Sequence, residues 1–529
     1  RLFAEDAAQG FAFIDLCRKR YDVVVMNPPF GEASESLASY LGNEFPNWNK
    51  NILCAFIERE VSCLHERSFL ASVMDRSLLN KSSYGKFRKS VLLIGEKLIC
   101  VLDLGWEVLD ANVEVAGCIL SSSKRLAGQT TCIDLRDVTP GQKASTLPAQ
   151  FDGADSTRIY SHKTKGFSAF PNHSIVYDLP ESLLTAFLRH KSLKARGYLS
   201  FTGHQLQSDR HFRNFWEISQ EEGLSSAGKF CHLYNGGEYS RFTLPPREVV
   251  WFGAYSKLSS EDFPSYSYRI QNKEKHFQRG VGFGVRGDYL DAHLLPDGLL
   301  FTVEGQVLPT HSYDKALFLV GLLSSAVASR LLNTYAGQHK YSGYVNLLPC
   351  PTGSGAEETQ IARLVEDAIK KKRAAYSFDE TCLLFRVPQI VVGDGGLTDA
   401  GRLTEDAFRA KSEALNEIVA RIDFLVCSLY ALRDDASLAD ITSYISRIPQ
   451  EALLGADRGA SDSISIRIIS DVSSYALGAV FGRWDIRYAA GERPAPELSN
   501  PFDPLPVCPP GMLQGDDGLP LSPEEGKRQ

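Results

Sequence analysis

The spacing of apolar residues in the first 120 positions alternates between a strand period and a helix period. The unbroken apolar run from Val23 to Met26 predicts a short strand buried on both faces. Residues 51–64 place apolar side chains at helical spacing, with Glu58 and Glu60 off that stripe. The same reading predicts strands at 68–75, 97–105 and 113–123 and a helix at 84–94. This alternation predicts an α/β fold, a doubly wound sheet with a parallel core.

The pattern changes twice further along the chain. From about Gly128 it becomes irregular and polar, which predicts a crossing between domains. Between Lys191 and Leu290 there are 14 Lys and Arg against 10 Asp and Glu, together with 18 aromatic residues. Short apolar segments broken by Gly and Pro predict a β-rich domain there, with rings and cations exposed for stacking on bases and contacting phosphates. An aromatic β core with an ordinary surface would have the same composition.

Helical patterns dominate the last part of the chain. Helices are predicted at 313–337, 357–376 and 408–432, the first closed by Gly337. The basic run Lys370 to Arg373 is interpreted as a solvated helix face. From Glu492 the chain is Pro-rich and acidic, so we expect it to be extended or disordered, or cut off from a later domain.

The composition of the chain argues against several classes of protein. The chain has 529 residues, of which 43% are hydrophobic and 23% charged, which is typical of globular proteins with roughly three or four domains. No apolar stretch is long enough to span a bilayer, so no membrane partner is expected. The 11 cysteines include no C-x-x-C pair, which argues against a zinc ribbon or disulfide scaffold; no metal site is predicted, and buried thiols in a reducing cytoplasm are expected. The net charge of -7 leaves only a local basic surface for nucleic acid.

The residues after the first strand carry the most specific chemistry. In Asn27-Pro28-Pro29-Phe30 the two prolines end regular structure and hold Asn27 in extended geometry. Ligands of open α/β sheets bind at this end of a strand. A carboxamide oxygen, backbone carbonyls and an aromatic face there suit a planar amine, because the acceptors take its N–H protons and the ring stacks on it. A strand followed by a plain Pro-Pro turn is the competing interpretation.

Together these features resemble the N6-adenine DNA methyltransferases, and more narrowly the gamma-class enzymes within large type IIG-like restriction-modification or phage-defence proteins. The resemblance rests on the Asn-Pro-Pro-aromatic loop, the strands and helices after it, and the aromatic-basic region. It implies a partial Rossmann-like class I methyltransferase sheet, followed by a mixed β-rich target-recognition domain and a helical C-terminal region. The implied segments are catalytic (1–135), connector (136–182), DNA-binding (183–351), helical (352–490) and tail (491–529).

The resemblance also assigns roles to residues. Asn27 and the Pro28 carbonyl would accept hydrogen bonds from the exocyclic amine of a flipped-out adenine, while Phe30 stacks on the base and Pro29 keeps the loop rigid. Asp6 falls where the family places an acidic residue near the adenine of S-adenosylmethionine. Double-stranded DNA is the implied partner, with possible restriction or defence-system subunits. Candidate DNA-binding residues are Arg210, Arg213, Lys273, Lys275 and Arg279.

The chain departs from the family pattern in three places. The Gly-rich cofactor loop should precede Arg1, so we expect an internal fragment that is inactive on its own. Leu53 stands where relatives often carry tyrosine, and Leu109 where many carry an aromatic that stacks on the base. Separately, Gly282 to Gly287 satisfies G-x-G-x-x-G, but no apolar strand leads into it, so a surface turn or a flexible loop near DNA is expected there.

Two other functions stay open. The same loop also serves methylation of glutamine amides in proteins and of RNA bases. A DNA-binding specificity module with a degenerate methyltransferase half would fit Leu53 and Leu109. No nuclease signature stands out within the sequence.

Overall fold

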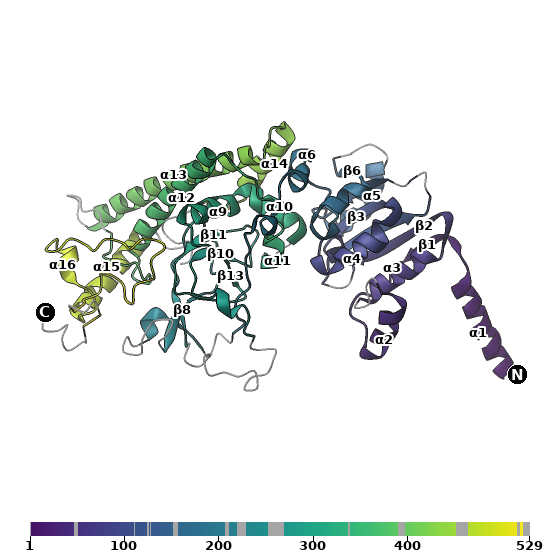
Figure 1. The fold of residues 1–529 in the computed structure, drawn as a ribbon, viewed down its shortest axis with the longest axis horizontal. Helices are drawn as coiled ribbons and strands as arrows, with labels where there is room; N and C mark the ends of the chain where they lie inside the picture. The colour runs from purple at the N-terminus through teal and green to yellow at the C-terminus, as the bar shows by residue number, and fades with distance from the viewer. Residues whose placement is uncertain are drawn as a thin grey trace. The chain divides into compact units, whose positions relative to one another are not determined.

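The chain forms two compact units, Arg1–Leu188 with Thr334–Gly337 and Arg189–Asn333 with Gln338–Gln529 (Figure 1). The computed structural model describes residues 2–46, 51–109, 112–123, 126, 128–151, 157–206, 211–218, 229–251, 269–336, 339–389, 397–450, 464–515 and 519–521. The five-segment division implied by the resemblance stays a prediction.

A six-stranded mixed sheet forms the centre of the first unit, in the order β1-β2-β4-β3-β5-β6. Its strands are β1 (Tyr21–Met26), β2 (Leu64–Asp75), β3 (Leu98–Gly105), β4 (Val115–Ser121), β5 (Gln129–Asp134) and β6 (Ile159–Lys163). The α/β class is confirmed, but the core is parallel only in the β1–β2 and β3–β5 pairs. β4 runs antiparallel to both of its neighbours because the chain between β3 and β4 is too short for a crossover helix.

The described part of the first unit also contains helices. They are α1 (Leu2–Arg18), α2 (Glu35–Glu44), α3 (Ile52–Ser62), α4 (Gly85–Phe87), α5 (Pro140–Phe151) and α6 (Glu181–Arg189), with 3-10 turns η1 (Arg76–Leu79) and η2 (Ser82–Tyr84). One hydrophobic cluster joins Leu53 and Ile57 of α3 to Leu70 and Met74 of β2. The helix predicted at 84–94 is broken, since α4 continues as a π-helical turn at Arg88–Leu92.

Two expectations about the sheet are wrong. β1 is an edge strand, and Val23 and Val25 are 60% and 77% exposed, so the strand is not buried on both faces. Only Val24 and Met26, which point the other way, pack on the core. The irregular stretch after Gly128 is not a mere crossing, because it supplies β5 and β6 to the same sheet.

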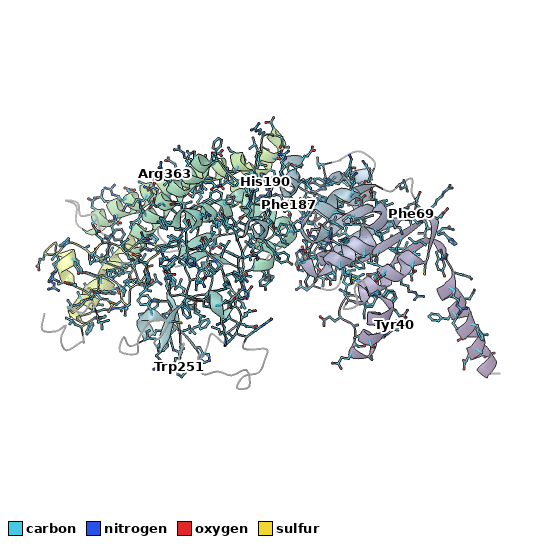
Figure 2. The ribbon with its side chains drawn as sticks, in the orientation of Figure 1. Tyr40, Phe69, Phe187, His190, Trp251 and Arg363 are labelled. Carbon is cyan, nitrogen blue, oxygen red and sulfur yellow. The ribbon has the colours of Figure 1, made fainter. Side chains whose placement is uncertain are left out.

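The second unit contains two small sheets, β11-β10-β13 and β12-β8-β9-β7. Their strands are β7 (Phe212–Asn214), β8 (Phe230–Tyr234), β9 (Glu248–Trp251), β10 (Gly280–Gly284), β11 (Ala292–Leu295), β12 (Leu300–Phe301) and β13 (Gly305–Pro309). Tyr234, Phe283 and Phe301 are buried, so part of the aromatic excess builds the core. Trp251 at the end of β9 is 41% exposed (Figure 2).

Helices complete the second unit. They are α9 (Tyr313–Leu323), α10 (Ala326–Ala336), α11 (Ser342–Val345), α12 (Gly355–Tyr376), α13 (Leu397–Leu429), α14 (Asp435–Ile445), α15 (Ile464–Val480) and α16 (Ile486–Ala489). The single helix predicted at 313–337 is therefore two helices, and Gly337 lies outside the described residues. The Ser324 hydroxyl binds both backbone groups of Ala292, and Ser325 accepts a hydrogen bond from the Ala328 N–H. These contacts end one helix and cap the next.

The predictions for the basic run and the tail are corrected in part. Lys372 and Arg373 are 3% and 7% exposed, because Lys372 donates to Ser240 Oγ and the Arg241 carbonyl while Arg373 donates to the Ser499 carbonyl. Only the first half of the run faces solvent. Over the described residues 492–515 the tail has no regular helix or strand but is ordered, since Phe502, Cys508 and Leu513 are buried.

In the described part of the chain, no single helix has the length and apolar character needed to cross a bilayer. The pair α9 and α10, bent by 66°, meets both criteria when taken together. The ten cysteines whose side chains are described are all free thiols, nine of them buried.

Candidate functional site

The Asn27–Phe30 loop lies where β1 ends, at the edge of the sheet to which the parallel strand β2 also points. Met26 of β1 pairs with Ser72 of β2, so the chain leaves β1 three residues before β2 ends at Asp75. This is the carboxyl edge at which open α/β sheets bind ligands. The predicted position of the loop is confirmed.

Each residue of the loop has a different environment. Asn27 is exposed, so its carboxamide is available to a ligand. The Pro28 ring is buried and Pro29 is exposed, and together they fix two successive φ angles. Phe30 is half-buried and packs against the hydrophobic cluster of the sheet. The loop therefore presents an amide on a rigid backbone next to a ring that the core supports.

The end of the loop is tied to α3. Gly31 adopts φ +122°, a conformation that L side chains rarely adopt, and its carbonyl accepts a hydrogen bond of 3.1 Å from the Ile52 N–H. Glu32 forms an isolated antiparallel bridge with Asn51. Asn51 in turn caps α3, because its Oδ1 accepts from the Leu53 N–H at 3.1 Å.

A second polar contact runs from Asn51 to Tyr84. The Asn51 Nδ2 donates to the Tyr84 hydroxyl at 2.8 Å, and both residues are buried. Burial raises the pKa of Tyr84 above its ordinary value, while the hydrogen bond from Asn51 acts in the opposite direction. Burial likewise raises the pKa of the neighbouring Cys54 thiol, with smaller contributions from Asp75 and Glu58. Cys54 therefore stays protonated and is not a nucleophile.

The same sheet edge holds a buried carboxylate at the end of β3. Asp103 is fully buried and accepts hydrogen bonds from Arg76 Nε at 2.7 Å and from the Tyr177 hydroxyl at 2.6 Å. Arg136 Nε lies 3.7 Å from the same carboxylate. Burial raises the pKa of Tyr177, helped by the charge of Asp103, so Tyr177 remains a donor. These contacts tie the end of β2 to the end of β3.

Asp6 is the predicted contact to S-adenosylmethionine. It lies in α1 and is exposed, 12 residues before the last helical residue Arg18, which corresponds to about 18 Å along the helix axis. Asp103, a buried carboxylate at the same sheet edge as the loop, is engaged by Arg76 and Tyr177.

The two departures from the family pattern lie in different surroundings. Leu53 is fully buried in the core on α3, so this position contributes to packing and does not face a ligand. Leu109 is half-buried in the loop after β3.

The candidate DNA-binding residues differ in their surroundings, and their role stays a prediction. Arg210 lies outside the described residues, Arg213 is exposed on β7, and Lys273 is exposed in the 3-10 turn η10 (Lys273–Lys275). The Lys275 ammonium lies 5.0 Å from the centre of the Phe201 ring. Arg279 donates through Nε to Asp297 at 2.7 Å, so its charge is paired inside the unit.

The Gly-rich motif is not a dinucleotide loop, and its first half, residues 282–284, is not a surface turn. Residues 280–284 form the buried strand β10, paired with β11 and β13. A Cβ atom at Gly282 would lie 2.4 Å from Leu295 Cδ1 and 2.8 Å from the Tyr234 ring. Close packing of neighbouring side chains explains this glycine, and phosphate binding does not.

Sequence reasoning missed Asn51 and Tyr84. Asn51 could have been found, because an asparagine directly before an apolar-periodic run is a helix N-cap signal. Tyr84 could not, since its partner lies 33 positions away. Among the described residues, no group of three or more His, Cys, Asp or Glu side chains is placed to hold a metal ion.

Comparison with known proteins supports the predicted resemblance of the first unit to methyltransferases. Residues 3–105 match the family described as Eco57I restriction-modification methylase. The matched range contains the Asn27–Phe30 loop, α3 and Tyr84. It confirms the predicted resemblance to the methyltransferases of restriction-modification systems.

Two relatives extend the comparison beyond residue 105. The adenine-specific methyltransferase BrxX of Escherichia coli O9:H4 (strain HS) is 22% identical over 374 residues, which is 66% of this chain and 28% of BrxX. The structure of the type IIL restriction-modification enzyme MmeI in complex with DNA matches with a TM-score of 0.50 and 11% identity, over 80% of this chain and 56% of MmeI. The second likeness concerns the fold alone. The chain thus spans about a quarter to a half of the proteins it matches.

Proposed function

We propose that this chain carries the base-holding part of an adenine-specific DNA methyltransferase in a restriction-modification or phage-defence system. The observation that carries the proposal is the Asn27–Phe30 loop, exposed at the carboxyl edge of the sheet within the matched range 3–105. BrxX is named as adenine-specific and MmeI was solved with DNA, which supports adenine in double-stranded DNA as the substrate.

The loop acts on the amine in this proposal. The Asn27 carboxamide oxygen and the Pro28 carbonyl accept hydrogen bonds from the two N–H groups of the exocyclic amine of a flipped-out adenine. An aromatic amine is a poor nucleophile because its lone pair is delocalised into the ring, and two acceptors favour a pyramidal nitrogen whose lone pair points at the methyl group. Positioning of this kind is worth about 7–11 kcal/mol of barrier for well-oriented groups.

Phe30 and the prolines supply stability to this arrangement. Extruding a base costs a few kcal/mol, and stacking on Phe30 offsets part of that cost. The ring is half-buried against the sheet core, so it loses little freedom when a base stacks on it. Pro28 and Pro29 fix the backbone that carries both acceptors.

S-adenosylmethionine is the proposed methyl donor and supplies the transferred methyl group when bound. The family match supports its use. The role of Asp6 near the adenine of S-adenosylmethionine stays a prediction. We place the protein in the cytoplasm, where DNA and this donor are found together and where its free thiols stay reduced.

Transfer of tritiated methyl groups to duplex DNA by the full-length protein tests the proposal. Asn27→Ala should lower the rate at least about 100-fold, since it removes an acceptor that the transition state uses. Equal rates for the variant and the wild type would reject this role for the loop. Competition by RNA or by a glutamine-bearing peptide, but not by duplex DNA, would favour the alternative substrates.

The DNA-binding module with a degenerate methyltransferase half makes a different prediction. It requires salt-sensitive DNA binding without any binding of S-adenosylmethionine in calorimetry of the full-length protein. The burial of Leu53 removes one argument for this alternative, because that departure does not alter a ligand-facing surface.

A further inference from the structure

One short segment at the start of α3 fixes the end of the base-holding loop. The Ile52 N–H donates to the Gly31 carbonyl at 3.1 Å, and Glu32 bridges to Asn51. Because two prolines make residues 27–30 rigid, their orientation depends on where Gly31 and Glu32 are held. A shift of the α3 end would therefore be passed to the carboxamide of Asn27.

Asn51 does more than cap its helix. Its Oδ1 must face the Leu53 N–H, since a backbone amide only donates, and this orientation turns Nδ2 towards Tyr84. A helix cap alone needs only the first of these bonds. The second, at 2.8 Å between residues that are 7% and 6% exposed, links the α3 end to a separate segment of the chain.

Tyr84 is itself held tightly. It precedes Gly85, where a Cβ atom would lie 2.9 Å from the Asn172 carbonyl oxygen, so the two segments approach more closely than any side chain allows. The fully buried Arg88 donates to the carbonyls of Leu78 and Asn172, both at 2.8 Å. These bonds lie on either side of Tyr84 and fix its backbone.

We infer that Asn51 and Tyr84 are a pair of positioning residues that set the orientation of the Asn27–Phe30 loop. The inference rests on the proposed function. Neither residue touches the base; Tyr84, anchored through Gly85 and Arg88, holds Asn51, and Asn51 holds the residues that follow the loop. Loss of the bond between them lets the loop rotate and moves the Asn27 acceptor away from the amine.

A double-mutant cycle in the full-length protein tests the pair. Asn51→Ser keeps a residue that caps helices but cannot reach Tyr84, and Tyr84→Phe removes only the hydroxyl. Each should lower the single-turnover rate of methyl transfer about 10-fold to 100-fold, with the dissociation constant for DNA unchanged within about 2-fold. The double variant should be no slower than the slower single one, because both changes break the same bond.

Ile57→Val provides the matched control. It truncates a fully buried side chain on the same helix and leaves the hydrogen bonds of Asn51, Tyr84 and Gly31 in place, so it should leave the single-turnover rate unchanged while lowering the melting temperature. The inference is overturned if the Asn51 and Tyr84 variants retain the wild-type rate, or if their effects add. Asn27→Ala, assayed alongside, separates this result from failure of the proposed function, which would show as full activity in that variant.

Discussion

The two most distinctive short motifs of the chain, Asn27–Phe30 and Gly282–Gly287, occupy opposite kinds of place. The first leaves the carboxyl edge of a sheet and exposes an amide. The second begins inside a sheet, where β10 lies between β11 and β13 and the side chains of Tyr234 and Leu295 fill the space above Gly282. Prolines at a strand end create a rigid ligand-facing surface, while glycines within a strand make room for neighbours. Position in the sheet, more than residue type, decides which motif is accessible to a ligand.

Phe30→Ala should have a large effect on the first motif, comparable to that of Asn27→Ala. Losing the stacking ring should lower methyl transfer by about 100-fold, since base–aromatic stacking is worth ~1–3 kcal/mol and the loop also loses its contact with the core. Single-turnover assays on the full-length protein measure it. Phe30→Tyr keeps the ring and should stay close to wild type; a loss as large as that of Phe30→Ala would mean that stacking is not the function of this residue.

Low pH should lower the stability of the second unit around the second motif. His276 lies against Phe301, with ring centres 4.1 Å apart, and its Nδ1 accepts a hydrogen bond from the Phe301 N–H. Burial lowers the pKa of His276 from 6.5 to about 4. Stability from the neutral ring is therefore complete above pH 6.5 and is lost as the pH falls towards 4, amounting to roughly 2–3 kcal/mol.

Urea denaturation of the full-length protein at several pH values measures this effect. His204, whose pKa burial lowers to about 3, adds to the same slope because its Nδ1 accepts from the Gln271 N–H. His276→Asn keeps an acceptor but cannot titrate, so its stability should change less between pH 6.5 and 4. An identical slope in the variant would show that His276 does not contribute.

Gly282→Ala should destabilise the second unit without altering chemistry directly. The new methyl group would overlap Leu295 and Tyr234, which typically costs about 1–3 kcal/mol. Gly343→Ala is the matched control, because that glycine lies in α11 with nothing within 4 Å of the added atom. Loss of S-adenosylmethionine binding at unchanged stability in Gly282→Ala would restore the cofactor interpretation of the motif.

The smallest effect concerns the basic side chains near the second motif. The logarithm of the DNA association constant falls linearly with the logarithm of salt concentration. Lys273→Ala should reduce the magnitude of that slope by about 0.9, as expected when one phosphate contact is lost. Arg279→Ala should change it less, because Asp297 already pairs with that guanidinium. Filter binding at four salt concentrations distinguishes them, and a larger change for Arg279 would mean that its ion pair opens on DNA.

Local chemistry was predictable from the sequence, and non-local packing was not. The Asn27–Phe30 loop, α3, α12 and α13 follow from residues within one segment. The break between α9 and α10 depends on Ser324 meeting Ala292, and the burial of Lys372 depends on Ser240. The exposure of β1 depends on its place at the sheet edge, which an apolar run alone cannot reveal. The antiparallel β4 could have been expected from the short connection that precedes it.

The edge position of β1 also determines how fast the backbone amides leading into the loop should exchange with deuterium. Only β2 pairs with β1 among the described strands, so the outward amides of β1 have no ladder partner in the sheet. Such amides exchange with deuterium rapidly, whereas those of β2 and β4 exchange only when the sheet opens. The strand that leads into the Asn27–Phe30 loop should therefore exchange faster than the α3 side, where the Ile52 amide binds Gly31.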